Sequence, residues 1–225
     1  MRRLDAIPYN DYRHIVRISY FQLTNLGLHK NTDRSAYETR NGKTVCIDDE
    51  IPFDIPDSWA WARLGTVLLP MESKLPIGEW FEYIDIDAID NKRNCVTIPK
   101  KLKVIDAPSR ASRGLKTGDT LFSVVRPYLR NIAHINARLA NCIASTGFYV
   151  CRPSAGVDDQ YLFNLLCTDY VVNGLNAFMK GDNSPSIRVE HIHDFIIPIP
   201  PLAEQKRIVA KIEEVRGLVE LITQT

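Results

Sequence analysis

The sequence lacks the features of a membrane protein, a secreted protein or a metalloprotein. Among its 225 residues no apolar run is long enough to span a bilayer, and no apolar core of an export signal follows the basic N-terminus. The five cysteines are scattered and none forms a C-x-x-C pair, so neither a disulfide framework nor a zinc site is indicated. These absences favour a cytoplasmic protein with reduced thiols, without a cofactor and without membrane association.

No complete nucleotide-binding or methyl-transfer motif is present either. Gly42-Lys43-Thr44 resembles the end of a phosphate-binding loop, but Tyr37 stands where the first glycine is required. Ile7-Pro8-Tyr9 lacks the polar residue and the second proline that hold the target amine in amino-methyltransferases, and no glycine-rich cofactor loop accompanies it. We therefore expect no methyl transfer by this chain alone.

Two groups of potential metal ligands have simpler explanations. His191, His193 and Asp194 stand just before an apolar segment with no third ligand at a useful spacing, which favours surface or capping roles. Asp85 and Asp87 alternate with apolar residues, as the exposed side of a half-buried strand does. The sequence thus predicts a protein that is not an enzyme. A nuclease that uses Asp85 and Asp87 is the weakest alternative.

The charge is segregated along the chain although the net charge is only +1. Residues 45–91 carry eleven acidic residues against two basic ones, whereas residues 100–138 carry nine basic residues against two acidic ones. Two interpretations are open. The basic segment can form a face for a polyanion, or the two segments can neutralise each other as neighbouring strands.

Periodicity predicts an α+β fold that is rich in β-structure, with few helices before a long C-terminal helix. We expect an N-terminal segment over residues 1–50, with a weak helix near Ile15–Leu23 and then a loop or linker over His29–Lys43 that includes an Asn41-Gly42 turn. A globular domain follows over residues 51–200, and a terminal helix over 201–225. Expected strands or extended segments are Trp59–Trp61, Tyr83–Asp87, Thr120–Val125, Ile132–Ile135, Phe148–Cys151 and Phe195–Pro201.

Two helices are predicted near the C-terminal end. The first is capped by Asp158 or Asp159 and continues to Val171, with its apolar residues on one face. The second starts at Pro201 and carries an apolar seam at spacings of 4, 3, 4 and 3, formed by Ile208, Ile212, Val215, Val219 and Ile222. A narrow seam needs a partner, which is either another helix or the helix's own domain.

The basic segment has the side chains that nucleic-acid contacts use. Arg110-Ala111-Ser112-Arg113 and Val124–Asn131 combine arginines with hydroxyl groups, a tyrosine and an asparagine beside predicted strand ends. Such groups contact both phosphates and base edges.

Four stretches resemble, in the right order, motifs of type I restriction-modification specificity subunits. PFDIPDSWAWARLG at residues 52–65 is similar to the opening of a target recognition domain. GDTLFSVVRPYLRN at residues 118–131 and ASTGF at residues 144–148 are similar to its central motifs. PPLAEQKRIV at residues 200–209 is similar to the start of its spacer helix. The resemblance covers about residues 51–225.

The resemblance implies a DNA-recognition subunit of a restriction system. In that family two recognition domains each read half of a bipartite target, and long helices set their separation and dock methyltransferase subunits. This chain has one such domain and one clear helix, so it resembles half of a complete subunit. The implied partners are double-stranded DNA, the methyltransferase subunits and, through them, the restriction subunit, with a homodimer through the terminal helix as an alternative. A competing function is a scaffold that binds methyltransferase subunits without DNA.

The resemblance also divides the candidate residues. Motifs shared by modules that read different targets cannot encode the target, so these residues are expected to hold the framework or to touch phosphates: Arg126, Tyr128, Arg130, Ser145 and Thr146. Base reading is expected from less typical segments, with Lys74, Arg93, Arg110, Arg113, Lys180, Asn183, Ser184 and Arg188 as candidates. Ser112 joins the expected DNA-binding set as a hydroxyl beside Arg113.

Overall fold

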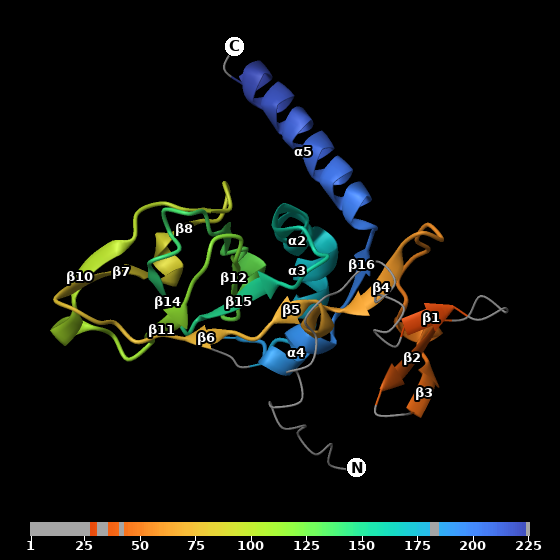
Figure 1. Cartoon of the computed structure of the whole chain (residues 1–225), viewed down its shortest axis with the longest axis horizontal. Coiled ribbons are helices and arrows are strands. Elements are labelled where there is room, and N and C mark those ends of the chain that lie inside the picture. The colour runs from red at the N-terminus through yellow and green to blue at the C-terminus, as the bar shows by residue number, and fades with distance from the viewer. Residues whose placement is uncertain (1–27, 31–35, 41–42, 181–184, 224–225) are drawn as a thin grey trace.

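The computed structural model describes residues 28–30, 36–40, 43–180 and 185–223 (Figure 1). The helix expected near Ile15–Leu23 and the Asn41-Gly42 turn lie outside these residues, as do the candidate DNA-binding residues Asn183 and Ser184. None of the helices in the described ranges has the length and apolarity needed to cross a bilayer.

A small sheet replaces the loop expected over His29–Lys43. Its three antiparallel strands are β1 (Leu28–Lys30), β2 (Ala36–Arg40) and β3 (Lys43–Cys46). The expectation of a loop was wrong because it considered only how few apolar side chains this polar segment has to bury. Here backbone pairing forms the ladder, and the β2 residue Glu38 accepts a hydrogen bond of 2.8 Å from the Arg63 guanidinium of the main domain.

Two sheets form the body of the main domain. The five-stranded sheet has the order β10 (Lys100–Lys103), β7 (Trp80–Ile84), β14 (Ile143–Ser145), β11 (Ala111–Gly114), β6 (Glu72–Ser73). The four-stranded sheet has the order β13 (Ile132–His134), β12 (Thr120–Ser123), β15 (Phe148–Pro153), β5 (Leu68–Leu69). Two strand pairs complete the set, β4 (Ala60–Arg63) with β16 (Ile196–Ile199), and β8 (Ile89–Asp90) with β9 (Cys95–Val96).

The four-stranded sheet is buried on both faces. Successive residues of a strand point to opposite faces, so Leu121 joins an apolar cluster with Ile84 and Ala144 of the five-stranded sheet. Its neighbour Phe122 joins a second cluster with residues of the helices, such as Leu162. This arrangement explains why the stretch from Thr120 reads as a buried strand and not as an alternating one.

The helix expected from Asp158 to Val171 is two helices. α2 (Asp159–Leu166) begins where the Asp158 side chain accepts hydrogen bonds from the backbone N–H groups of Gln160 and Tyr161, as expected. α3 (Asp169–Asn176) begins at Thr168, whose hydroxyl accepts a hydrogen bond from the Val171 N–H and caps a new first turn. A break between the helices lets both apolar faces reach the core, although the apolar spacing alone is compatible with one helix.

The remaining helices lie around the β4–β16 pair. α4 (Val189–Asp194) precedes β16, and α5 (Leu202–Thr223) follows it and projects away from the body of the domain (Figure 1). Short 3-10 turns connect the strands at Asp48–Glu50, Leu64–Thr66, Ile86–Ala88, Val104–Asp106 and Pro127–Leu129. The turn at Ile86–Ala88 corrects the expected strand Tyr83–Asp87, because the Asp85 side chain accepts a hydrogen bond from the Ile86 N–H and ends β7.

Candidate nucleic-acid interface

One edge of the five-stranded sheet gathers four of the expected DNA-binding residues. The Lys74 N–H donates a hydrogen bond of 2.9 Å to the Ser112 carbonyl, and Arg113 pairs with Ser73 of β6. The Arg110 carbonyl accepts a hydrogen bond of 2.8 Å from the N–H of Thr146, which lies in the turn between β14 and β15. Backbone pairing thus brings Lys74, Arg110, Ser112 and Arg113 together.

A second segment adds residues from farther along the chain. The Ile187 N–H donates to the Val124 carbonyl at 3.0 Å, and the Arg126 N–H donates to the Pro185 carbonyl at 2.8 Å. Lys180 forms an isolated bridge with Ser186. The segment up to Arg188, which precedes α4, therefore lies beside the turn after β12 and carries Lys180 and Arg188 with it.

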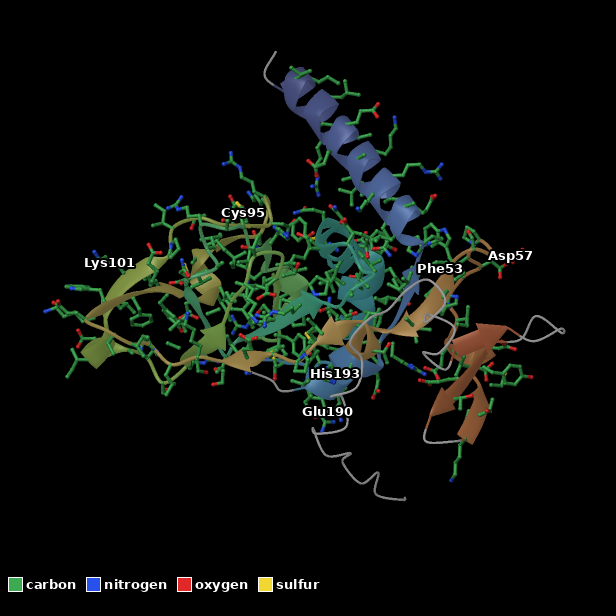
Figure 2. The ribbon with its side chains drawn as sticks, viewed as in Figure 1. Phe53, Asp57, Cys95, Lys101, Glu190 and His193 are labelled. Carbon is green, nitrogen blue, oxygen red and sulfur yellow. The ribbon has the colours of Figure 1, made fainter. Side chains whose placement is uncertain are left out.

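The two segments meet at a groove of about 330 Å³. We define the groove face as Lys74, Arg110, Ser112, Arg113, Arg126, Lys180 and Arg188. The groove itself is lined by Arg113, Val124, Thr146, Phe148, Tyr149, Ile187, Arg188, Val189 and Glu190. Glu190 lies at the side of the molecule away from α5 in Figure 2.

The charges of the acidic and basic segments partly neutralise each other. Lys100 forms an ion pair with Asp87, and Lys116 with Glu72. Within the described ranges, Lys74, Arg110, Arg113 and Arg188 form no ion pair with a carboxylate. Both interpretations of the segregated charge therefore hold, each for different residues. Four of the unpaired cations gather on the groove face, whereas Lys101 and Lys103 lie elsewhere, over the Trp80 ring of β7.

Three candidates lie apart from the groove face. The Arg130 guanidinium forms an ion pair with Asp169 and donates a hydrogen bond of 3.0 Å to the Cys167 carbonyl, so it holds a turn against the helices. Tyr128 is exposed on the 3-10 turn Pro127–Leu129. Arg93 lies in the β8–β9 turn close to Cys95, which Figure 2 places at the edge opposite Glu190.

Other motif residues build the framework. Asp119 is fully buried and accepts hydrogen bonds of 2.8 Å from the Arg152 guanidinium, and this contact raises the pKa of Arg152. Ser145 is buried and accepts a hydrogen bond from the Gly147 N–H. A Cβ at Gly147 would lie 2.8 Å from the Ile86 Cδ1 atom, so a larger residue in this turn would require the Ile86 side chain to move.

The two histidines of the possible metal group have separate structural roles. The Arg188 N–H donates to His191 Nδ1 at 3.2 Å, while the Tyr149 hydroxyl lies 2.7 Å from His193 Nε2. Burial lowers the pKa of both imidazoles. His191 thus stabilises the start of α4, and His193 ties that helix to β15.

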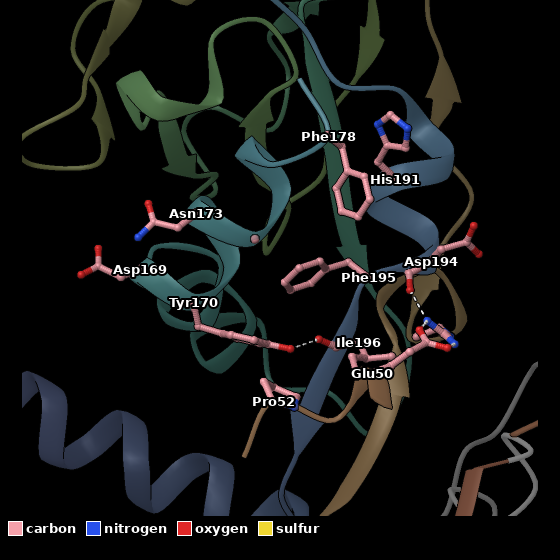
Figure 3. Close-up of a pocket in the computed structure, with 12 residues that line it drawn as sticks. Glu50, Pro52, Asp169, Tyr170, Asn173, Phe178, His191, Asp194, Phe195 and Ile196 are labelled. Atoms are coloured by element: carbon pink, nitrogen blue, oxygen red, sulfur yellow. Dashed lines mark hydrogen bonds and ion pairs between the residues drawn. The ribbon is translucent and has the colours of Figure 1, made fainter. Parts of the chain in front are cut away.

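A larger pocket of about 710 Å³ lies between α3 and the segment from α4 to β16 (Figure 3). Aromatic side chains line it, including Tyr170, whose hydroxyl donates a hydrogen bond of 2.6 Å to the Ile196 carbonyl. The cation in its lining, Arg63, is already bound by the carboxylates of Glu38 and Glu50. Because its remaining charged side chains are acidic, this pocket does not suit a polyanion.

Of the nine residues that line the groove, the sequence analysis proposed Arg113, Thr146 and Arg188 as site residues. Arg110, Arg113 and Arg188 were all expected to bind DNA, and Thr146 was expected as a framework or phosphate contact. Glu190 and the apolar wall residue Ile187 were missed. No local pattern marks them, because they reach the groove only through the long-range pairing of Ile187 with Val124.

Comparison with known proteins identifies relatives. Residues 115–225 match a family model described as type I restriction modification DNA specificity domain. The chain is 28% identical over 169 residues to the specificity subunit of the type I restriction enzyme HindI from Haemophilus influenzae, covering 74% of this chain and 37% of that protein. It is 22% identical over 182 residues to the EcoAI specificity subunit from Escherichia coli, covering 74% of this chain and 30% of that protein.

A solved structure gives the same result for the fold. The HsdS subunit from Thermoanaerobacter tengcongensis superposes with a TM-score of 0.72 and 38% sequence identity, over 78% of this chain and 46% of that chain. A structure that describes complex assembly and conformational transition of the type I R-M system superposes with a TM-score of 0.71. This chain spans less than half the length of each of these relatives for which coverage is given above.

Proposed function

The chain belongs to the family of type I restriction-modification specificity subunits, and on that premise we propose that it binds double-stranded DNA through the groove face. One observation carries the proposal. Lys74, Arg110, Arg113 and Arg188 converge there without carboxylate partners in the described ranges, whereas the buried guanidinium groups of Arg63 and Arg152 are paired. Unpaired cations on a rigid surface are what phosphate contacts require.

The division of labour follows from the same premise. The chain supplies recognition of one half of a bipartite target, and methyltransferase subunits supply the chemistry. Base reading falls to residues of the groove face that do not line the groove itself, including Ser112 and Lys180, whereas Arg130 and Ser145 hold the framework. We keep Asn183 and Ser184, which lie outside the described residues, as base-reading candidates.

We assign the docking of methyltransferase subunits, and through them the restriction subunit, to α5. Its first turns pack on the domain, where Ile208 and Val209 contact the main core. Farther along, Val215, Leu218 and Leu221 are about half to two-thirds exposed. An apolar stripe on a projecting helix favours a partner helix, supplied by a methyltransferase subunit, by the other half of a complete subunit or by a second copy.

The exposed end of α5 also supports the second candidate function, a scaffold that binds methyltransferase subunits without DNA. The two functions predict different results with purified components. A scaffold would retain methyltransferase subunits but would bind all DNA duplexes equally weakly. A recognition subunit would enrich one sequence.

Selection of DNA from a random pool tests the proposal. The chain is mixed with its methyltransferase subunit, bound duplexes are sequenced, and affinity for the enriched duplex is measured against salt. We expect one enriched half-site. Replacement of Lys74, Arg110, Arg113 and Arg188 by Ala should lower affinity and flatten the log–log salt slope by about 0.9 for each lost phosphate contact.

A matched control uses cations that are already paired. The double variant Lys100→Ala, Lys116→Ala removes two positive charges that contact Asp87 and Glu72, so its salt slope should stay near that of the wild type. Equal slopes for the wild type and the groove-face variant would place the DNA surface elsewhere.

A further inference from the structure

Arg113 occupies an unusual position in the groove. It lies in β11 between two neighbouring strands, paired with Ser73 of β6 on one side and with Ala144 of β14 on the other. The register of β11 with β14 shifts between Ala111 and Arg113, which marks a bulge. Bulges redirect side chains at functional sites, and pairing on both sides fixes this one in place.

The Arg113 guanidinium has no partner within the described ranges. Its Nε atom is buried and makes no hydrogen bond there, and no carboxylate forms an ion pair with it. The contrast is Arg152, a buried arginine whose Nε and Nη2 atoms both donate to Asp119 at 2.8 Å. A desolvated donor without an acceptor costs free energy. No carboxylate neutralises the Arg113 guanidinium within the described ranges, so its charge can attract an anion that enters the groove.

Two further groups face the same recess. Thr146 and Arg188 line the groove with Arg113, and Phe148 and Ile187 add apolar side chains to the lining. Glu190 is exposed in the lining and is its one carboxylate, so the groove keeps a net positive charge. Two guanidinium groups and a hydroxyl are a donor set suited to the oxygen atoms of a phosphate.

We infer that this groove seats one phosphate of the DNA backbone, with Arg113 as the residue that fixes the register of the duplex. The inference rests on the DNA binding proposed above. A recess can receive only a group that projects from the duplex, and phosphates project while base edges lie inside the grooves. Arg113 therefore positions the DNA, whereas the sequence alone suggested that it reads a base.

The function of such a seat is alignment. Because β11 is paired on both sides, the seat cannot shift relative to the sheet, so one anchored phosphate sets where the neighbouring loops meet the bases. Arg188, which is exposed at the start of α4, closes the seat from the opposite side. An error in this register would reduce binding even to the correct sequence.

Single neutral phosphates test the inference. On the half-site duplex enriched from the random pool, each phosphate in turn is replaced by an uncharged methylphosphonate, and binding is measured by fluorescence anisotropy. For the wild type we expect one position at which affinity falls roughly 10-fold to 100-fold, the loss of a charge-assisted contact. Arg113→Ala should bind unmodified DNA more weakly by a similar factor and should lose sensitivity at that position.

Two further variants separate this role from a structural one. Arg113→Lys keeps the charge without the planar fork and should recover part of the affinity and part of the sensitivity. Lys116→Ala, a charge loss at a residue paired with Glu72, should keep the wild-type methylphosphonate pattern. Urea unfolding of each variant shows whether a loss of binding reflects a loss of folded protein.

The possible outcomes are distinct. If Arg113→Ala keeps the wild-type sensitivity at every phosphate, or instead loses discrimination at one base pair, the phosphate seat is wrong while DNA recognition stands. If the wild type enriches no duplex from the pool and binds none, the proposed function fails and the inference fails with it.

Discussion

The side chain of Gln205 accepts a hydrogen bond of 2.8 Å from the backbone N–H of Asp158, the residue that caps α2. The Gln205 amide also donates to the carbonyls of Gly156 and Pro200, and the whole side chain is buried. One glutamine in the first turn of α5 therefore fixes the direction in which that helix leaves the domain.

We expect Gln205→Leu to lower the free energy of unfolding by about 2–3 kcal/mol, because a leucine of similar size removes the partner of one buried and two partly buried backbone groups. Urea denaturation measures the change. Lys206→Leu, at an exposed neighbour on the same helix, should change stability by less than about 0.5 kcal/mol. A Gln205→Leu protein with the wild-type midpoint would show that these hydrogen bonds do not hold α5.

Stability should fall in mildly acidic solution because of His193. Burial lowers the pKa of its imidazole, although Asp194 and Glu190 act in the opposite direction. Below about pH 6.5 the unfolded chain binds a proton that the folded chain does not, so the free energy of unfolding decreases from there down to the folded-state pKa. Above that range the imidazole is neutral in both states and its contribution is fully present.

His193→Gln tests this directly. Glutamine offers an amide near the position of Nε2 for the Tyr149 hydroxyl but does not titrate. As the pH is lowered from 7.5 to the folded-state pKa of His193, the free energy of unfolding should decrease less for the variant than for the wild type. Urea unfolding at each pH measures this difference. Identical pH profiles for the two proteins would remove His193 as the cause.

Arg110 and Arg130 should show opposite effects, although both are arginines of the basic segment. Arg110 is exposed on the groove face, whereas Arg130 contacts Asp169 and the Cys167 carbonyl. Arg110→Ala should weaken DNA binding and leave stability unchanged. Arg130→Ala should cost about 1 kcal/mol of stability, mainly from the hydrogen bond to Cys167, with the salt slope of DNA binding unchanged. Fluorescence anisotropy measures DNA binding and urea titration measures stability for both variants. A loss of stability in Arg110→Ala together with a loss of DNA binding in Arg130→Ala would contradict the assignment of Arg110 to DNA contact and Arg130 to the framework.

Much of the fold could be predicted from local patterns of apolar residues, because these patterns reflect which face of a strand or helix is buried. The β12, β13 and β15 strands begin at the expected residues Thr120, Ile132 and Phe148, and α5 begins at Leu202, one residue after the expected Pro201. In each case an apolar run or a helical period identifies the buried face of the element. The polar hairpin β2–β3 was not accessible, because its pairing depends on backbone hydrogen bonds and on the distant Arg63.

The residue types of the candidate site could be predicted from the sequence, but their arrangement in space could not. Both Arg113 and Arg130 are basic residues beside predicted strand ends. The resemblance assigns Arg130 to the framework or to phosphates and Arg113 to base reading, but nothing local says which of them has an acid nearby. Asp169 pairs with Arg130 through the packing of α3 on a turn 39 residues away in sequence. Arg113 meets Arg188 only because Ile187 pairs with Val124. Which cations remain available for DNA is therefore a property of tertiary structure.

The last prediction concerns the seam of α5 formed by Ile208, Ile212, Val215, Val219 and Ile222, which we propose as the helix interface. Ile208 packs on the domain core, and the Arg216 guanidinium donates a hydrogen bond of 2.7 Å to the Asn164 side chain, so this helix contacts its own domain as far as Arg216. Along the seam the exposed fraction rises to 48% at Val215 and 74% at Ile222. Packing on the domain and contact with a partner helix are thus compatible, because they use different residues of α5.

Val215→Glu combined with Val219→Glu should leave the domain folded, because both side chains are exposed in the single chain. In an assembly the same charges would be buried without partners, so self-association or methyltransferase docking should weaken by at least about 100-fold. Light scattering measures the mass of the assembly, and Lys206→Glu with Ala210→Glu places two charges on exposed positions outside the seam as a control. An assembly that both double variants form as readily as the wild type would show that the seam faces solvent in the complex and that the docking surface lies elsewhere on the chain.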